Sequence, residues 1–139
     1  MSETRSAVVE REFPFPPEKL WRALTQPHLM EEWLMKNDFM PAVGHKFNLK
    51  GEWGGTLDCE VLTIEPNREL AYTWDYAHEN AAFNLKSVVT FTLTPNATGT
   101  RLRVEQAGFR PEQKQAAGGA YAGWQQMLTK LDQLLMRTE

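Results

Sequence analysis

The sequence predicts an α+β fold in which a curved antiparallel sheet of about six strands wraps around one long C-terminal helix. Between residues 46 and 105, strand-like segments with apolar residues at every second position follow one another across short turns. Sequential strands joined by short turns favour an antiparallel meander. From residue 115 to 137, apolar residues recur at helical spacing. We expect this long helix to cover the apolar face of the sheet, because the chain contains no other large apolar element.

The N-terminal part of the sequence predicts one strand followed by two short helices. Residues 5–13 form the strand pattern. Proline is favoured at the first helical position, so a helix is expected from Pro17 to about Leu24. A second helix is expected directly afterwards, with Thr25 as its cap and Pro27 in its first turn.

Two irregularities are expected within the central strands. The alternation of apolar Leu57, Cys59 and Val61 changes phase after Val61, which predicts a β-bulge. Further on, residues 96–99 carry turn chemistry. The glycosylation sequon that begins at Asn96 falls in this turn, and we interpret it as a chance match.

Composition restricts the kind of protein and its partners. The 139 residues suit one domain covering residues 1–139, and the net charge of −3 without a basic run disfavours nucleic acid. No apolar segment is long enough for a membrane span, and the N-terminal residues lack a secretion signal, so we expect a cytoplasmic protein with no membrane partner. The only cysteine, Cys59, is expected to be a buried, unreactive thiol. A homodimer is compatible with these observations.

The titratable residues show no arrangement typical of catalysis or metal binding. The three histidines, His28, His45 and His78, are separated from one another, so we expect no metal site and no cofactor. Asp58 and Glu60 share the polar face of a strand and are expected to point to solvent. No catalytic motif is recognisable, so a binding protein is favoured over an enzyme.

Aromatic side chains are the strongest candidates for a functional site. Tyrosine and tryptophan have polar atoms that need partners when buried, and a cavity that contains a polar ligand would provide them. The alternative is an ordinary core, because burial of each ring is itself stabilising by roughly 1.5–3 kcal/mol. The candidate ligand-binding residues are Trp33, Trp53, Trp74, Tyr76, Phe91, Phe109, Tyr121, Trp124 and Leu128.

Several segments together resemble the START-like superfamily of helix-grip proteins, which includes the polyketide cyclases. Within it, the chain resembles the branch related to the activator of the heat-shock-protein ATPase, which includes stand-alone bacterial proteins. The segments that carry the resemblance span residues 17–25, 33–34, 43–47, 53–61, 64–74, 89–93, 99–102, 108–109 and 123–124. The resemblance implies a hydrophobic cavity between the sheet and the C-terminal helix.

Three functions follow from the residues and the resemblance. The first is a binding domain for a hydrophobic or amphipathic small molecule. The second is an enzyme of the cyclase or hydrolase kind, for which Tyr76, His78 and Glu60 are the candidate polar groups. The third is a chaperone cofactor, which requires an exposed apolar patch as a docking surface. The absence of a catalytic motif favours the first.

Overall fold

The computed structural model describes residues 5–52, 54–77 and 84–138. It confirms the α+β fold with two short helices after the first strand and a long helix at the end. The helices are α1 (Pro17–Thr25), α2 (Pro27–Trp33) and α3 (Lys114–Arg137). The strands are β1 (Arg5–Phe13), β2 (Lys36–Asn37), β3 (Lys46–Lys50), β4 (Thr56–Glu65), β5 (Glu69–Tyr76), β6 (Leu85–Asn96) and β7 (Gly99–Phe109).

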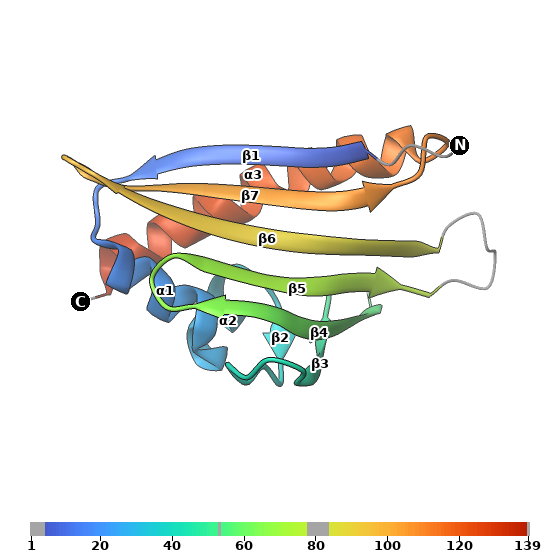
Figure 1. Ribbon diagram of the computed structural model, residues 1–139, viewed down its shortest axis with the longest axis horizontal. Helices are drawn as coiled ribbons and strands as arrows, with labels where there is room; N and C mark the ends of the chain where they lie inside the picture. Colours follow the sequence, from blue (N-terminus) through green and yellow to red (C-terminus); the bar gives the residue numbers. More distant parts are fainter. Residues whose placement is uncertain (1–4, 53, 78–83, 139) are drawn as a thin grey trace.

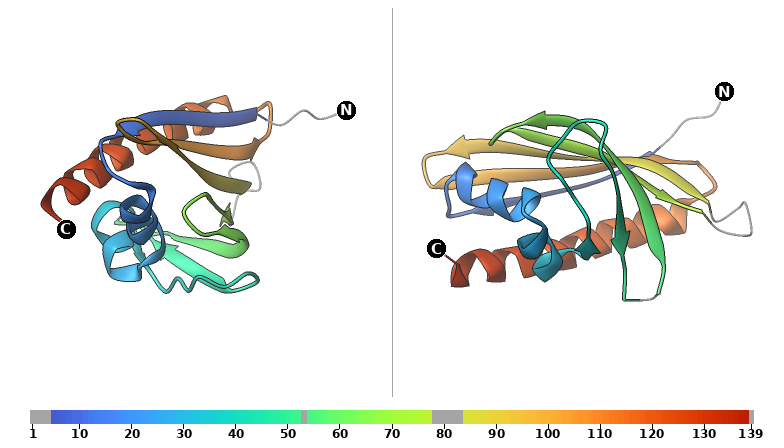
Figure 2. Two further views of the ribbon diagram at one scale, coloured as in Figure 1. Left: turned by 60° about the vertical axis from the view of Figure 1, so that its left-hand side comes forward. Right: turned by 90° about the horizontal axis from the view of Figure 1, so that it is seen from below.

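All the described strands form one antiparallel sheet with the order β1-β7-β6-β5-β4-β3-β2. The meander runs from β2 to β7, and β1 pairs with β7, so that Val9 lies opposite Val104. The register shifts between Val61 and Thr63, which confirms the expected bulge in β4. The sheet has seven strands because the two residues of β2 pair with the end of β3. Figure 2 shows how the sheet curves around α3.

The helix boundaries agree with the expectations for α1, but the expected cap of α2 is wrong. Helix α1 begins at Pro17 as predicted and ends at Thr25. The N-cap residue of α2 is Gln26, and no side chain caps this helix. Thr25 is still part of α1, so its hydroxyl donates back to the Trp21 carbonyl four residues earlier at 2.7 Å.

Helix α3 lies across the concave face of the sheet, from the end of β7 to the region of α1 (Figure 1). It begins one residue before the predicted position and ends at Arg137 as predicted. Its buried face supplies the apolar contacts with the sheet, and the buried residues are Trp124, Leu128, Leu131, Leu134 and Leu135. At its C-terminal end, Lys19 of α1 donates to the Thr138 carbonyl at 2.7 Å. The helix is thus fastened to the first third of the chain.

The centre of the core is an aromatic cluster between α2, the sheet and α3. Phe91 of β6 lies in the middle, with ring centroids at 6.3 Å from Trp33, 5.7 Å from Tyr72 and 5.6 Å from Trp124. All four side chains are at most 1% exposed. This cluster fills the space between sheet and helix near the middle of α3.

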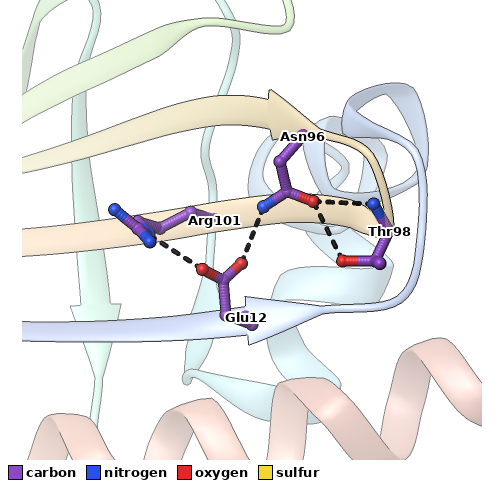
Figure 3. A network of polar contacts seen from close by, with 4 residues as sticks. All are labelled: Glu12, Asn96, Thr98 and Arg101. Atoms are coloured by element: carbon purple, nitrogen blue, oxygen red, sulfur yellow. Dashed lines mark hydrogen bonds and ion pairs between the residues drawn. The ribbon is translucent and has the colours of Figure 1, made fainter.

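At one end of the sheet, a polar network joins β1 to the turn between β6 and β7 (Figure 3). Glu12 accepts hydrogen bonds from Arg101 and Asn96, each at 2.9 Å. The Asn96 side chain also accepts the backbone N–H of Thr98 at 3.0 Å. The asparagine of the sequon therefore shapes the turn, as the sequence suggested.

Among the described helices, none is both long enough and apolar enough to cross a membrane.

Candidate functional site

The main pocket lies where the first turn of α3 approaches the ends of β4, β5 and β6. Its volume is about 990 Å³. One wall comes from strand residues and the other from residues 111–116, which lead into α3. The strand residues that line it are Leu57, Trp74, Tyr76 and Leu85. The pocket is therefore a part of the sheet–helix interface that side chains do not fill.

An aromatic pair separates this pocket from the core. The rings of Trp74 and Trp124 have centroids 5.2 Å apart and are inclined at 54°. Trp124 also contacts Phe91 edge-on, so the pair continues into the aromatic cluster. Trp74 lines the pocket, whereas Trp124 stands behind it. A ligand in the pocket would therefore meet a wall held rigid by the core.

A chain of buried hydrogen bonds fixes the tryptophan pair. The indole N–H of Trp124 donates to the Gln106 side-chain oxygen at 2.8 Å, and the Gln106 amide donates to the Ser87 hydroxyl at 3.1 Å. The Ser87 hydroxyl donates to the Trp74 carbonyl at 2.6 Å, so the chain of hydrogen bonds runs from Trp124 to Trp74. Gln106 is 2% exposed and Ser87 is 4% exposed. These bonds satisfy polar groups that would otherwise be costly to bury.

Gln113 holds the wall that precedes α3. Its side-chain oxygen accepts the Arg110 backbone N–H at 3.0 Å, and its amide donates to the Asn84 carbonyl at 2.8 Å. The residue occupies the N-cap position of α3 but forms no capping bond with its side chain. Its amide instead fastens the residues before α3 to the start of β6. Gln113 thereby determines how far this wall stands from the sheet.

The structure distributes the sequence-predicted residues among different environments. Trp74 and Tyr76 line the main pocket. Trp33 lies at a second hollow of about 800 Å³ between α2, the end of β3 and α3. Trp53 lies outside the described residues. Three further candidates are, like Trp33, 1% exposed, and they line neither hollow: Phe91, Phe109 and Trp124.

Two candidates on α3 are separated by the shape of the sheet. Leu128 is completely buried under the sheet. Tyr121 is 47% exposed and lies in a groove beside residues 5–8 of β1. The physical reason is that the start of α3 runs along the edge of the sheet, so this helical face is only partly covered there. Tyr121 therefore does not line the main pocket with Trp74.

The polar side chains Gln106, Ser87 and Gln113 were not among the sequence candidates. Gln106 sits on the buried face of β7, where the apolar alternation of Leu102 and Val104 continues to a polar residue. A polar residue in an inward position is a signal for a buried network. In the sequence, this signal is the place of Gln106 two residues after Val104, on the same face of the strand.

Burial controls the ionisation of two titratable groups in the core, Cys59 and Tyr72. Desolvation raises the pKa of the Cys59 thiol to about 12, with smaller contributions from Asp75, Asp58 and Asp38. Desolvation also raises the pKa of Tyr72 well above its usual value. Both groups are therefore neutral near pH 7, and Cys59 is buried as expected. Neither supplies a nucleophile or a base.

The polar groups proposed for catalysis have different positions. Tyr76 lines the main pocket. Glu60 is half-buried on β4, whereas neighbouring Asp58 is exposed and accepts a hydrogen bond from the Asn48 amide at 2.8 Å. His78 lies outside the described residues. Within residues 5–52, 54–77 and 84–138, no three His, Cys, Asp or Glu side chains are grouped so that they could hold a metal ion.

Comparisons with known proteins agree with this architecture. Protein MLL2253 from Mesorhizobium loti is 67% identical, with a TM-score of 0.94 over 97% of this chain and 99% of that chain. CalU16 from Micromonospora echinospora is 24% identical, with a TM-score of 0.80 over 97% of this chain and 78% of that chain. DynU16, described as a protein of the dynemicin biosynthetic locus, is 23% identical, with a TM-score of 0.83 over 95% of this chain and 47% of that chain.

CalU16 and DynU16 share the fold with this chain, and their identity supports nothing beyond the fold. No curated protein matches the chain significantly. The sequence pattern of the family described as activator of Hsp90 ATPase homolog 1-like protein matches residues 14–136. Together with the close relative from Mesorhizobium loti, this match shows that the chain belongs to the activator of Hsp90 ATPase homolog 1-like family of the START-like superfamily.

Proposed function

We propose that the protein binds a hydrophobic or amphipathic small molecule in the main pocket. The observation that supports this most strongly is a pocket of about 990 Å³ between the strand ends and the start of α3. Small-molecule sites usually have volumes of about 300–1,000 Å³ and combine an apolar lining with a few polar groups. The pocket matches this description, with Leu57, Trp74, Tyr76 and Leu85 on one wall and Gln113 on the other.

In this proposal, fewer residues contact the ligand than the sequence suggested. Trp74 and Tyr76 contact the ligand, because both line the pocket. Trp124 supports Trp74 from behind, and Phe91 supports Trp124. The polar atom of Trp124 is already bonded to Gln106, so Trp124 holds the wall and leaves the ligand's polar groups to other residues.

The affinity of such a pocket can be estimated from ligand size. At about 0.3 kcal/mol per heavy atom, an apolar dye of roughly seventeen heavy atoms gains about 5 kcal/mol. This corresponds to a dissociation constant on the order of 0.1 mM. The fluorescent probe N-phenyl-1-naphthylamine has this size and no charge, and it is therefore a suitable first ligand.

A pair of variants on one helix tests the site. Ala116 lines the pocket from the first turn of α3, whereas Ala122 is exposed on the same helix and lines none of the described pockets. We expect Ala116→Trp to weaken binding of the dye at least tenfold, because the indole occupies the ligand's volume, and Ala122→Trp to leave it unchanged. The measurement is a fluorescence titration. Equal affinities for the two variants, or no binding to the unmodified protein, would contradict the proposal.

A second function, that of a chaperone cofactor, has one observation in its favour. Exposed apolar side chains lie near one another on the loop before β3 and on β4, because the Gly44 N–H donates to the Val61 carbonyl at 2.8 Å. Met40 is 56% exposed, Val43 is 67% exposed and Leu62 is 41% exposed. If this patch contacts Hsp90, the purified chain should raise the chaperone's ATPase rate, and Val43→Asp should abolish the increase. An unchanged rate with the unmodified chain excludes this function.

A further inference from the structure

The described tryptophans differ in what their indole N–H groups bind. Trp33 donates to the Ala23 carbonyl at 2.8 Å, and Trp124 donates to Gln106 at 2.8 Å. Trp74 is 6% exposed, and the one side chain of the described part of the chain that bonds to it, Ser87, donates to its backbone carbonyl and not to its indole. The indole N–H of Trp74 therefore donates to no acceptor in residues 5–52, 54–77 and 84–138.

The accessible part of Trp74 includes this N–H. Among the described residues, no enclosed polar side-chain atom lacks a hydrogen-bond partner. The unbonded N–H of Trp74 is consequently reachable from outside, although the side chain as a whole is nearly buried. Trp74 lines the main pocket, and we infer that its accessible N–H faces this pocket. An otherwise buried donor that reaches a cavity marks a position for an acceptor from a ligand.

We propose that the ligand is a neutral molecule with a flat apolar body and one carbonyl-type oxygen that accepts the N–H of Trp74. This inference rests on the proposed function, because it describes the ligand of the same pocket. The indole of Trp74 and the phenol ring of Tyr76 provide aromatic contacts for a flat body. The ordinary net contribution of one hydrogen bond gives the carbonyl compound about a tenfold preference over a matched hydrocarbon.

The charges around the pocket favour a neutral oxygen. Glu112 and Lys114 line the pocket with opposite charges, and both residues are exposed. The strand residues on the Trp74 side, Leu57, Tyr76 and Leu85, include no lysine, arginine, histidine or carboxylate. A carboxylate beside Trp74 would lose its hydration without gaining a cation from this wall. A ketone, ester or amide oxygen loses much less on burial and accepts the same bond.

Two probes of almost equal shape test the inference, namely 2-acetylnaphthalene and 2-ethylnaphthalene. We expect the ketone to bind three- to tenfold more tightly. Two-dimensional ¹⁵N–¹H spectra of the unmodified protein should show the indole signal of Trp74 moving downfield with the ketone, and not with the hydrocarbon. Trp74→Phe identifies this signal and should remove the preference. Trp21→Phe, on the partly buried face of α1, should preserve it.

The possible results separate this inference from the proposed function. Equal affinities for the two probes, with the indole signal of Trp74 unshifted, would overturn the inference and leave the binding function intact. Tighter binding of 2-naphthoate than of the ketone would overturn the assignment of a neutral ligand. If neither naphthalene perturbs the resonances of the pocket residues, the binding function fails, and the inference fails with it. The spectra of the unmodified protein suffice even if Trp74→Phe does not fold.

Discussion

Cys59 and Tyr72 show how burial changes single residues in this protein. Desolvation raises the pKa of the Cys59 thiol from 9.0 to about 12. The unfolded chain releases this proton above pH 9, whereas the folded protein retains it. Stability from this residue is therefore fully present below about pH 9 and is lost as the pH rises toward 12.

Cys59→Ala should reduce the sensitivity of the fold to alkaline conditions. Between pH 8 and pH 10, the unmodified protein should lose about 1.4 kcal/mol more of its free energy of unfolding than the variant. Tyr72 contributes to the pH dependence of both proteins and cancels in the comparison. Urea unfolding at the two pH values measures the difference. Parallel losses in both proteins would show that the thiol ionises normally in the folded state.

Gln106 connects the tryptophan wall to the sheet, and its loss should destabilise the whole protein. Gln106→Leu removes the acceptor of Trp124 and leaves a buried N–H without a partner. We expect the free energy of unfolding to fall by about 1–3 kcal/mol. Gln125→Leu is the matched control, because Gln125 is exposed on α3. A similar loss of unfolding free energy in both variants would mean that the buried chain of hydrogen bonds adds no stability.

Among the elements, the hairpin of β6 and β7 can form its turn only with a glycine at position 99. Gly99 has a φ of 153°, and a Cβ at this position would lie 2.0 Å from the Phe13 carbonyl oxygen and 2.8 Å from the Phe15 nitrogen. These are backbone atoms of the segment that leads from β1 to α1, and they cannot move aside easily. The close approach brings this segment against the hairpin, next to the network of Glu12, Asn96 and Arg101 (Figure 3).

Two glycine substitutions should therefore have opposite effects. Gly99→Ala should strongly destabilise the protein or prevent folding, because its Cβ collides with backbone. Gly118→Ala should stabilise it by about 0.5–1 kcal/mol, since Gly118 lies within α3 and a Cβ there meets no atom within 4 Å. Thermal unfolding of both variants measures the effects. A fold that tolerates Gly99→Ala would contradict the close approach of these segments.

Residues at the same turn also affect the ionisation of the Glu12 carboxyl group. The hydrogen bond from Arg101 and the second from Asn96 lower the pKa of this carboxyl. Arg101→Gln should therefore raise the pKa of Glu12 toward its usual value, as followed by NMR titration. Because Glu12 is at the surface, we expect little change in stability. A pKa of Glu12 that is the same in both proteins would show that the pair does not persist in solution.

At the scale of the whole molecule, the main pocket is lined both by α3 and by the strands β4, β5 and β6. A ligand that binds only the folded protein should stabilise all of it by mass action. N-phenyl-1-naphthylamine at ten times its dissociation constant should add about 1.4 kcal/mol to the free energy of unfolding. Ala116→Trp should lose this increment. Thermal unfolding with and without the dye tests this, and an equal increment in the variant would place the dye elsewhere.

Regular elements followed directly from the periodicity of the sequence. The period of two in β4–β7 and the helical spacing in α3 report which residues face an apolar environment, and the structure has these elements close to the expected positions. A very short strand cannot be predicted in this way. The two residues of β2 are too few to display a period, and they form a strand only because the end of β3 lies beside them.

The roles of the aromatic residues were decided only in the folded molecule. Trp33, Trp74 and Trp124 belong to one residue type, and all three are at most 6% exposed. Trp33 finds its acceptor at Ala23 and Trp124 at Gln106, whereas the N–H of Trp74 has no acceptor among the described residues and Trp74 lines a pocket. Periodicity in the sequence indicates that a side chain points inward. Which atoms stand opposite depends on the curvature of the sheet and the path of α3 across it, and these arise from packing between distant segments.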